Sequence, residues 1–232
     1  MTEIILIAFY LVILLYSVIL HEISHGVVAL WMGDLTAKYA GRLTLNPRSH
    51  IDPWGSILVP LVMLALTGFR FAFGWAKPVP YNPYNLRFQK WGPALVAFAG
   101  PFTNFFLALI FAIAAKFIAI PSALKIDIIS SLQIANWEGL SIAVSGSLGA
   151  IFFLFFIMII FWNVLLAVFN LIPIPPLDGS KLFFSLFHIS LQKQAMMEQY
   201  GFILLLALVF IFSSPLSILL RFVWGIFYSI AI

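Results

Sequence analysis

Three runs of apolar residues are long enough to cross a membrane as helices. They cover residues 4–31, 93–118 and 145–171, and few polar side chains interrupt them. About 20 residues of α-helix span a hydrocarbon core about 30 Å thick, so each run is long enough to cross it once. The pattern therefore predicts an all-α polytopic membrane protein with a core of three transmembrane helices.

The shorter apolar runs admit more than one arrangement. Residues 54–67 are short for a span and contain Pro60, which is typical of a re-entrant or buried element. Near the end of the chain, Ser213-Ser214-Pro215 separates residues 200–212 from residues 216–232. These two runs predict one or two extra C-terminal spans, either as a tight helical hairpin or as one span plus an interfacial helix.

The segments between the apolar runs differ from them in character. Residues 33–53 are β-prone and are punctuated by glycine and by an Asn-Pro pair, a pattern that predicts one or two strands and a turn. Residues 74–82 are rich in proline, so we expect an extended conformation there. Residues 119–143 are mixed in polarity and predict a loop with a short surface helix.

The composition supports the membrane assignment. Of 232 residues, 63% are hydrophobic and 9% are charged, and the mean hydropathy is +1.11. This balance excludes an ordinary soluble protein, and no polar stretch is long enough to form a separate soluble domain. We therefore expect residues 1–232 to form a single membrane-embedded domain, with a core at about 4–180 and C-terminal helices at 181–232.

The charged residues and the lack of cysteine narrow the possible partners. The net charge of +4 is explained by lysines and arginines that flank the spans, so it indicates a multi-pass protein of the cell membrane and no nucleic-acid partner. The sequence contains no cysteine, which excludes thiolate ligands. Any metal ion must then be held by nitrogen and oxygen atoms.

The first apolar run contains the motif His21-Glu22-Ile23-Ser24-His25. On a helix, two histidines four residues apart lie on one face and can bind one ion. This arrangement is typical of zinc hydrolases, in which the metal acidifies a water and the glutamate is the general base. The alternative is a chance match whose side chains cap a helix or face a polar neighbour. Ionisable groups within a membrane helix are costly, which favours the functional interpretation.

A catalytic zinc ion usually has three protein ligands, so a third ligand is needed. Asp178 is the best candidate, because it follows the proline-rich residues 173–176 that must break the third span at membrane depth. It could instead cap a helix that starts near Gly179. His50 and Asp52 could also approach a metal, or could bond to the backbone of a turn.

A shared metal ion fixes the direction of the spans. His21, His25 and Asp178 must lie at one depth, and each motif stands toward the C-terminal end of its run. The first and third spans should therefore run in the same direction, with residues 93–118 as the single crossing between them and residues 54–67 re-entrant. Basic residues near the site place it toward the cytoplasm, with the N-terminus outside.

The chain resembles the site-2 proteases, which are intramembrane zinc metalloproteases. The resemblance rests on His21 to Gly26 and on an N-x-x-P-x-x-x-L-D-G pattern from Asn170 to Gly179. Residues 41–47, 75–79 and 99–104 resemble the compact bacterial and archaeal branch, and no PDZ-like or CBS-like domain is found.

This resemblance implies one Zn²⁺ per chain, bound by His21, His25 and Asp178, with Glu22 as the catalytic base. It also implies that Asn170 orients the substrate or stabilises the oxyanion. Residues 40–47 and 75–82 would correspond to short membrane-associated β elements that present the substrate. The substrates would be transmembrane proteins in the lipid bilayer, and the oligomeric state, a homo-oligomer included, stays open.

Two other functions are compatible with parts of the pattern. A non-catalytic zinc-binding membrane protein or chaperone would use the histidines but would have no need of Glu22. A transporter would spread ionisable residues over several spans or over repeated halves, whereas here they converge on one site. Both observations favour the protease.

Overall fold

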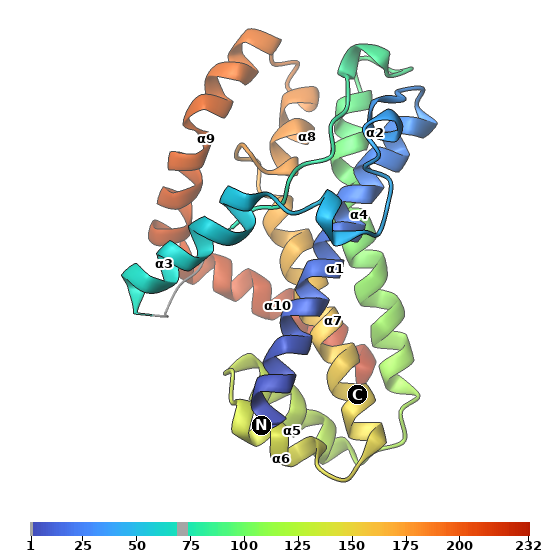
Figure 1. The fold of residues 1–232 in the computed structure, drawn as a ribbon, viewed down its shortest axis with the longest axis vertical. Helices are drawn as coiled ribbons and strands as arrows, with labels where there is room; N and C mark the ends of the chain where they lie inside the picture. Colours follow the sequence, from blue (N-terminus) through green and yellow to red (C-terminus); the bar gives the residue numbers. More distant parts are fainter. Residues whose placement is uncertain (1, 69–73) are drawn as a thin grey trace.

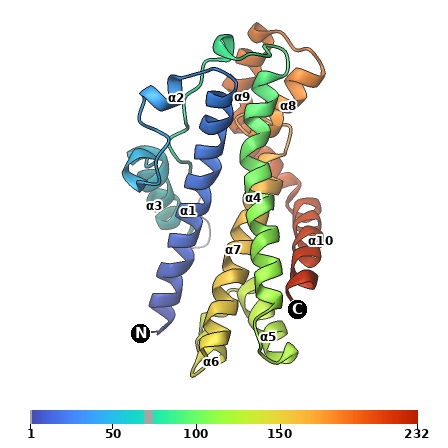
Figure 2. The same cartoon turned by 90° about the vertical axis from the view of Figure 1, so that its right-hand side faces the viewer.

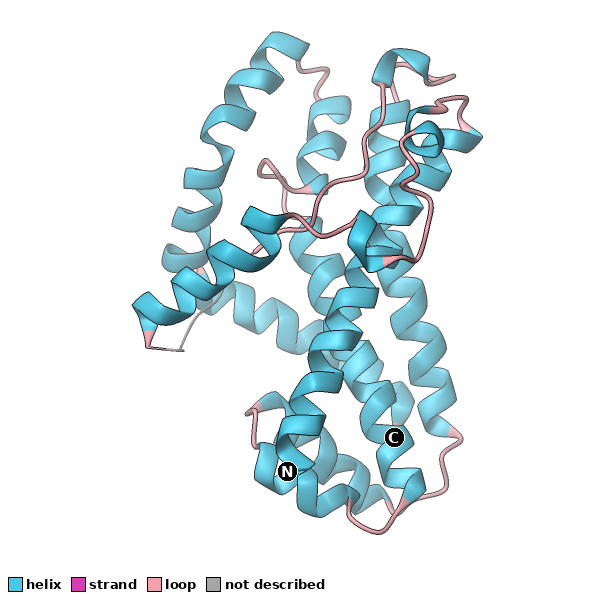
Figure 3. Cartoon of the chain, in the orientation of Figure 1, coloured by secondary structure: helices cyan, strands magenta, loops and turns pink. Residues whose placement is uncertain are grey.

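The computed structural model describes residues 2–68 and 74–232, and the regular elements in these ranges are all helical (Figure 3). The first half of the chain contains α1 (Thr2–Trp31), α2 (Thr36–Tyr39), α3 (Val59–Thr67), α4 (Gly92–Lys116) and α5 (Ser122–Gln133). The second half contains α6 (Trp137–Val144), α7 (Leu148–Asn170), α8 (Asp178–Leu186), α9 (Leu191–Ile211) and α10 (Ser213–Ala231). Shorter elements are 3-10 turns at Pro47–Ser49 and Pro83–Asn85 and a π-helix at Pro53–Leu58.

The three predicted spans correspond to α1, α4 and α7, whose ends differ from the prediction by a few residues. Together with α10 they are the helices of the described chain that are long and apolar enough to cross a membrane. Helix α4 packs against both α1 and α7, while α1 and α7 run in one direction and α4 runs against them (Figures 1 and 2). This is the arrangement that a site shared by α1 and the end of α7 requires.

Small residues on α4 allow this close packing. Ala108, Ala112 and Ala115 are fully buried, and they share one apolar cluster with large buried side chains of α7 such as Phe153 and Ile157. Lipid tails are as apolar as a protein core, so helices in a membrane associate through tight van der Waals packing of this kind. The predicted helical core is therefore held by shape complementarity between α4 and α7.

The π-helix and α3 follow one another and lead away from the bundle. The next described residues lie back where this segment begins, since the Trp75 amide donates to the Gly55 carbonyl at 3.1 Å. A Cβ atom at Gly55 would lie 2.2 Å from the Trp75 indole, so residue 55 has no room for a side chain. The excursion begins and ends on one side of the molecule, as expected for a re-entrant element.

The strands predicted within residues 33–53 and 75–82 are absent from the described residues, so this part of the prediction is wrong. Residues 36–39 form α2, and residues 74–82 are extended without a partner strand. The amides of this extended segment bond elsewhere: Lys77 N–H donates to His50 C=O at 2.8 Å, and Asn82 N–H donates to the Asp34 carboxylate at 2.7 Å. The fully buried Asp34 thereby ties the segment to the end of α1.

Residues 119–143 form two helices, α5 and α6, in place of the predicted loop with one surface helix. Lys125 of α5 is buried, with 3% of its surface exposed. Its ammonium donates to the Ala115 carbonyl at 3.3 Å and to the Ala231 carbonyl at 3.2 Å, and so meets the C-terminal ends of α4 and α10. A cation is favoured there because helix C-termini carry partial negative charge.

The C-terminal helices do not form a hairpin. Helix α9 begins at Leu191, so it joins the amphipathic stretch before residue 200 to the apolar run 200–211, and it meets α10 at a bend around Phe212. The two helices diverge from this bend, and α10 packs on α4 and α7 (Figures 1 and 2). Among the described residues, α10 is long and apolar enough to span a membrane.

Candidate metal centre

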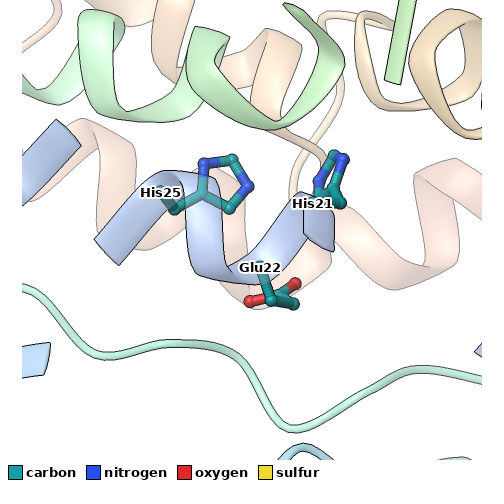
Figure 4. Close-up of side chains that lie close together, drawn as sticks. All are labelled: His21, Glu22 and His25. Carbon is teal, nitrogen blue, oxygen red and sulfur yellow. The ribbon is translucent and has the colours of Figure 1, made fainter. Parts of the chain in front are cut away.

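Helix α1 places its two histidines on one face and its glutamate on another. Figure 4 shows the imidazoles of His21 and His25 turned toward α4, whereas Glu22 points toward the extended segment 74–82. The candidate ligand atoms of the three residues lie within 4.8 Å of one another. The two histidines are buried, with 5% and 8% of their surface exposed.

The second nitrogen of each imidazole is held by α4. The Nδ1 atom of His25 lies 2.7 Å from the Val96 carbonyl, and Nδ1 of His21 lies 2.5 Å from Oδ1 of Asn104. A carbonyl oxygen can only accept, so both Nδ1 atoms carry a proton. Nε2 is then the atom of each ring on which a metal ion would take the place of a proton, as in a metal-binding histidine.

The Asp178 carboxylate completes the group. Its Oδ2 atom lies 3.0 Å from Nε2 of His21 and 3.3 Å from Nε2 of His25. Asp178 is the first residue of α8, whose N-cap is Leu177, so its side chain faces the histidines and does not cap the helix.

Two glycines make this convergence sterically feasible. A Cβ atom on Gly100 of α4 would lie 2.5 Å from Nε2 of His21 and 2.6 Å from Cε1 of His25. A Cβ atom on Gly179 would lie 2.2 Å from the Leu171 carbonyl, where the loop folds back over the end of α7. A side chain at Gly179 would therefore displace backbone, and one at Gly100 would displace the two imidazoles.

The residues present fit a zinc ion. Two imidazole Nε2 atoms and one carboxylate oxygen converge on one point, and this donor set matches the nitrogen and oxygen ligands of catalytic zinc sites. The tautomers are set by Asn104 and Val96, as expected when a second shell orients the ligands. The group could therefore hold a divalent metal with one position left for water.

Glu22 stands beside this group and is held by the extended segment. Its Oε2 atom accepts a hydrogen bond of 2.9 Å from the Val79 amide. Val79 is flanked by Pro78 and Pro80, which have no N–H, so it supplies the single amide donor within this tripeptide. The extended segment thus orients the carboxylate that the sequence predicted as base.

A cavity of about 670 Å³ opens onto the site. Asn170 lies on its wall, and its amide nitrogen donates to the Leu166 carbonyl at 2.9 Å, which leaves its second N–H free to turn toward the cavity. Other lining residues come from the extended segment and from α9; they include Trp75, Ala76, Pro78, Phe202 and Leu205. An elongated ligand in this cavity would pass next to the site.

His50 and Asp52 lie away from this group and do not line the cavity. The His50 imidazole is buried and bonds to the Thr44 carbonyl at 2.8 Å. Asp52 caps the π-helix through the Trp54 amide and also accepts from the Trp75 indole at 3.0 Å. The sequence allowed His50 and Asp52 either to approach a metal or to bond to the backbone of a turn, and the structure shows the second.

The sequence did not reveal the role of Asn163. Asn163 is 1% exposed and its side-chain oxygen accepts a hydrogen bond of 2.6 Å from the Asn104 amide, so α7 also contacts the residues around His21. The signal that could have found it is an uncharged amide within a strongly apolar run, residues 148–170, because a polar group in lipid needs a partner.

Comparison with known proteins finds one peptidase family and several relatives named as zinc metalloproteases. The model of peptidase family M50 matches residues 9–211. "Putative zinc metalloprotease YwhC" of Bacillus subtilis is 36% identical over 210 residues, which cover 90% of this chain and 82% of that protein. "Putative zinc metalloprotease Rip2" of Mycolicibacterium smegmatis is 30% identical, and the protein of that name from Mycobacterium tuberculosis H37Rv is 27% identical. Each alignment to Rip2 covers 71% of this chain but 52% of the relative. No solved structure matches the chain significantly.

Proposed function

The chain belongs to peptidase family M50, and from this membership we propose that it is an intramembrane zinc metalloprotease of the site-2 type. It would hydrolyse peptide bonds in or near the transmembrane segments of other membrane proteins. The observation that carries the proposal is the convergence of two Nε2 atoms and the Asp178 carboxylate beside Glu22, within an apolar helical bundle. Residues 1–232 would act as one membrane-embedded catalytic domain.

Zn²⁺ is the metal that the family and the names of its relatives indicate, and His21, His25 and Asp178 would hold one ion. When bound, it would supply a Lewis acid that activates water and polarises the scissile carbonyl. Glu22 would take the proton of the attacking water and deliver it to the nitrogen of the leaving amine. The Val79 amide would hold the Glu22 carboxylate in position for both transfers.

The substrate must be extended at the cleaved bond, because an intact helix keeps its amides in internal hydrogen bonds. In the extended segment, the amides of Lys77 and Val79 face one edge and bond to the protein. Ala76 faces the opposite edge and, among the described residues, its N–H and C=O have no hydrogen-bond partner. Since Ala76 also lines the cavity, we propose that an extended stretch of substrate pairs with this edge.

The orientation in the membrane follows from the charge distribution. Lys38, Arg48, Lys77 and Arg87 all lie between the end of α1 and the start of α4. Under the positive-inside rule this connection faces the cytoplasm, so cleavage would occur toward the cytoplasmic side of a multi-pass protein.

Removal of zinc tests the proposed function. Purified protein should cleave a single-span test substrate in detergent, lose this activity when a chelator removes the metal, and recover it when one equivalent of Zn²⁺ is added. The recovery depends on an intact ligand set, so a His21→Ala variant treated in the same way should stay inactive. Zinc binding without cleavage of any member of a broad panel of spans would favour a non-catalytic zinc-binding protein.

Asn170→Ala should lower kcat by about 10²–10³-fold if the amide donates to the oxyanion. The Asn170 amide lines the cavity next to the ligands and has one N–H to spare. Asn136→Ala is the matched control, because Asn136 caps α6 at the opposite end of the molecule. A similar kcat for both variants would remove Asn170 from the catalytic residues.

A further inference from the structure

We propose that Asn163 is a positioning residue of the metal centre, which acts through Asn104 to fix the tautomer and orientation of His21. This inference rests on the proposed function, because Asn163 would position His21 for the zinc ion that the proposed function requires. Neither asparagine offers a ligand atom to the metal group itself. Their contribution would lie in the hydrogen bonds that run from α1 through α7 and α4 back to α1.

The orientation of the Asn163 amide is set by two acceptors. Its nitrogen donates to the Ile159 carbonyl at 2.9 Å and to the Ser17 hydroxyl at 2.9 Å. A backbone carbonyl can only accept, so the nitrogen must point there and the oxygen of the amide must point the other way. This oxygen faces Asn104 at 2.6 Å.

The orientation of Asn104 follows from that of Asn163. Because Oδ1 of Asn163 can only accept, the Asn104 nitrogen must face it, and Oδ1 of Asn104 then faces Nδ1 of His21 at 2.5 Å. An oxygen at this position accepts the Nδ1 proton and leaves the Nε2 lone pair for the metal. The hydrogen bonds from Asn163 to Asn104 and from Asn104 to His21 therefore specify one tautomer of His21.

The two histidines differ in what holds them. The partner of His25 is the backbone carbonyl of Val96, whose orientation is fixed by the helix. The partner of His21 is a side-chain amide, and a rotation of about 180° would present its NH₂ group to Nδ1. The imidazole would then carry its proton on Nε2, where it blocks metal binding. Asn163 prevents this rotation, so His21 depends on a second residue and His25 does not.

Burial removes solvent as an alternative partner. Asn104 is 0%, Asn163 is 1% and Ser17 is 4% exposed. Because water is excluded, loss of the Asn163 amide would leave the Asn104 nitrogen without a hydrogen-bond acceptor. The amide of Asn104 would then lose its preferred orientation. The effect of a substitution at Asn163 should therefore be detected at the metal.

The test is the zinc affinity of the purified full chain, measured by competition with a chromophoric chelator. Asn163→Leu keeps the volume of the side chain and removes its polar atoms, and it should weaken zinc binding by about 10–100-fold. Asn163→Ala provides the same comparison if leucine prevents folding. The Co²⁺-substituted proteins should show a changed visible spectrum, because the angle of one imidazole ligand changes.

Two further variants separate positioning from general packing. Ile160→Ala removes a fully buried side chain of α7 from the apolar cluster and should lower thermal stability without changing the zinc affinity. Asn104→Asp, added to Asn163→Leu, should restore the affinity, because a carboxylate accepts the Nδ1 proton in either rotamer. A packing defect at residue 163 would not be repaired in this way.

The outcomes distinguish this inference from the proposed function. Wild-type affinity in Asn163→Leu, equal weakening by Ile160→Ala, or failure of Asn104→Asp to restore binding would each overturn the role of Asn163 while the metal site stands. A wild-type protein that binds no zinc would overturn the proposed function, and this inference with it.

Discussion

Glu22→Gln is expected to lower kcat by about 10²–10⁴-fold while the protein keeps one zinc ion per chain. Glutamine has nearly the same shape and can still accept the hydrogen bond from the Val79 amide through its oxygen. It cannot take a proton from water, so the base is lost and the metal ligands are left in place. This separation of zinc content from activity is specific to a hydrolase.

The measurement is single-turnover cleavage of a single-span substrate alongside zinc analysis of the same samples. Glu138→Gln serves as the control, because Glu138 lies in α6 at the end of the molecule away from the site. Unchanged cleavage by Glu22→Gln would exclude Glu22 as the base. Loss of zinc together with activity would make Glu22 a part of the metal-binding group.

Gly100→Ala is expected to abolish zinc binding and activity together. The added methyl group would lie 2.5 Å from Nε2 of His21 and 2.6 Å from Cε1 of His25, well inside van der Waals contact. The imidazoles must then move from the point at which they converge, and a zinc site tolerates deviations of only a few tenths of an ångström.

Zinc analysis and thermal unfolding of Gly100→Ala check this expectation. Gly225→Ala in α10 is the matched control, because a Cβ atom there meets nothing within 4 Å, and it should keep both zinc and activity. A Gly100→Ala protein that retains stoichiometric zinc would show that the histidines bind metal in a different position.

Long apolar runs made the helical core predictable. Each of residues 4–31, 93–118 and 145–171 can satisfy its backbone in a membrane only as a helix, so length and composition decide the structure. One ion shared by two spans also requires α1 and α7 to run parallel with α4 against them, which is the arrangement in Figures 1 and 2. The need to satisfy backbone hydrogen bonds inside a membrane acts on each span separately, so each could be predicted from its own residues.

Other features depend on contacts that no local pattern encodes. Residues 74–82 are extended as expected, but their amides bond to Glu22, His50 and Asp34 in place of a neighbouring strand. Local β-propensity could not indicate these partners, since they are distant in the chain. Lys125 lies in the segment predicted as a loop with a short surface helix, and its burial could not be predicted there because its partners are the ends of two other helices.

The candidate site contains residues that a local pattern identifies and residues that only tertiary contacts reveal. His21, Glu22 and His25 form a local helical pattern, so spacing alone identified them. The chain from Ser17 through Asn163 and Asn104 to His21 crosses three helices, and it becomes visible only when they are packed. Gly100 is similar, because its importance comes from the imidazoles that it faces.

X-ray absorption at the zinc edge of the purified protein tests the central claim most directly. The proposed site predicts one zinc per chain with two imidazole nitrogens at about 2.0–2.1 Å and oxygen ligands at about 2.0–2.2 Å. Asp178→Ala should lose the carboxylate from this shell and lower the zinc content, because the other two ligands remain alone. A zinc shell without paired imidazoles, or one that Asp178→Ala leaves unchanged, would contradict the assignment of His21, His25 and Asp178 as the metal site.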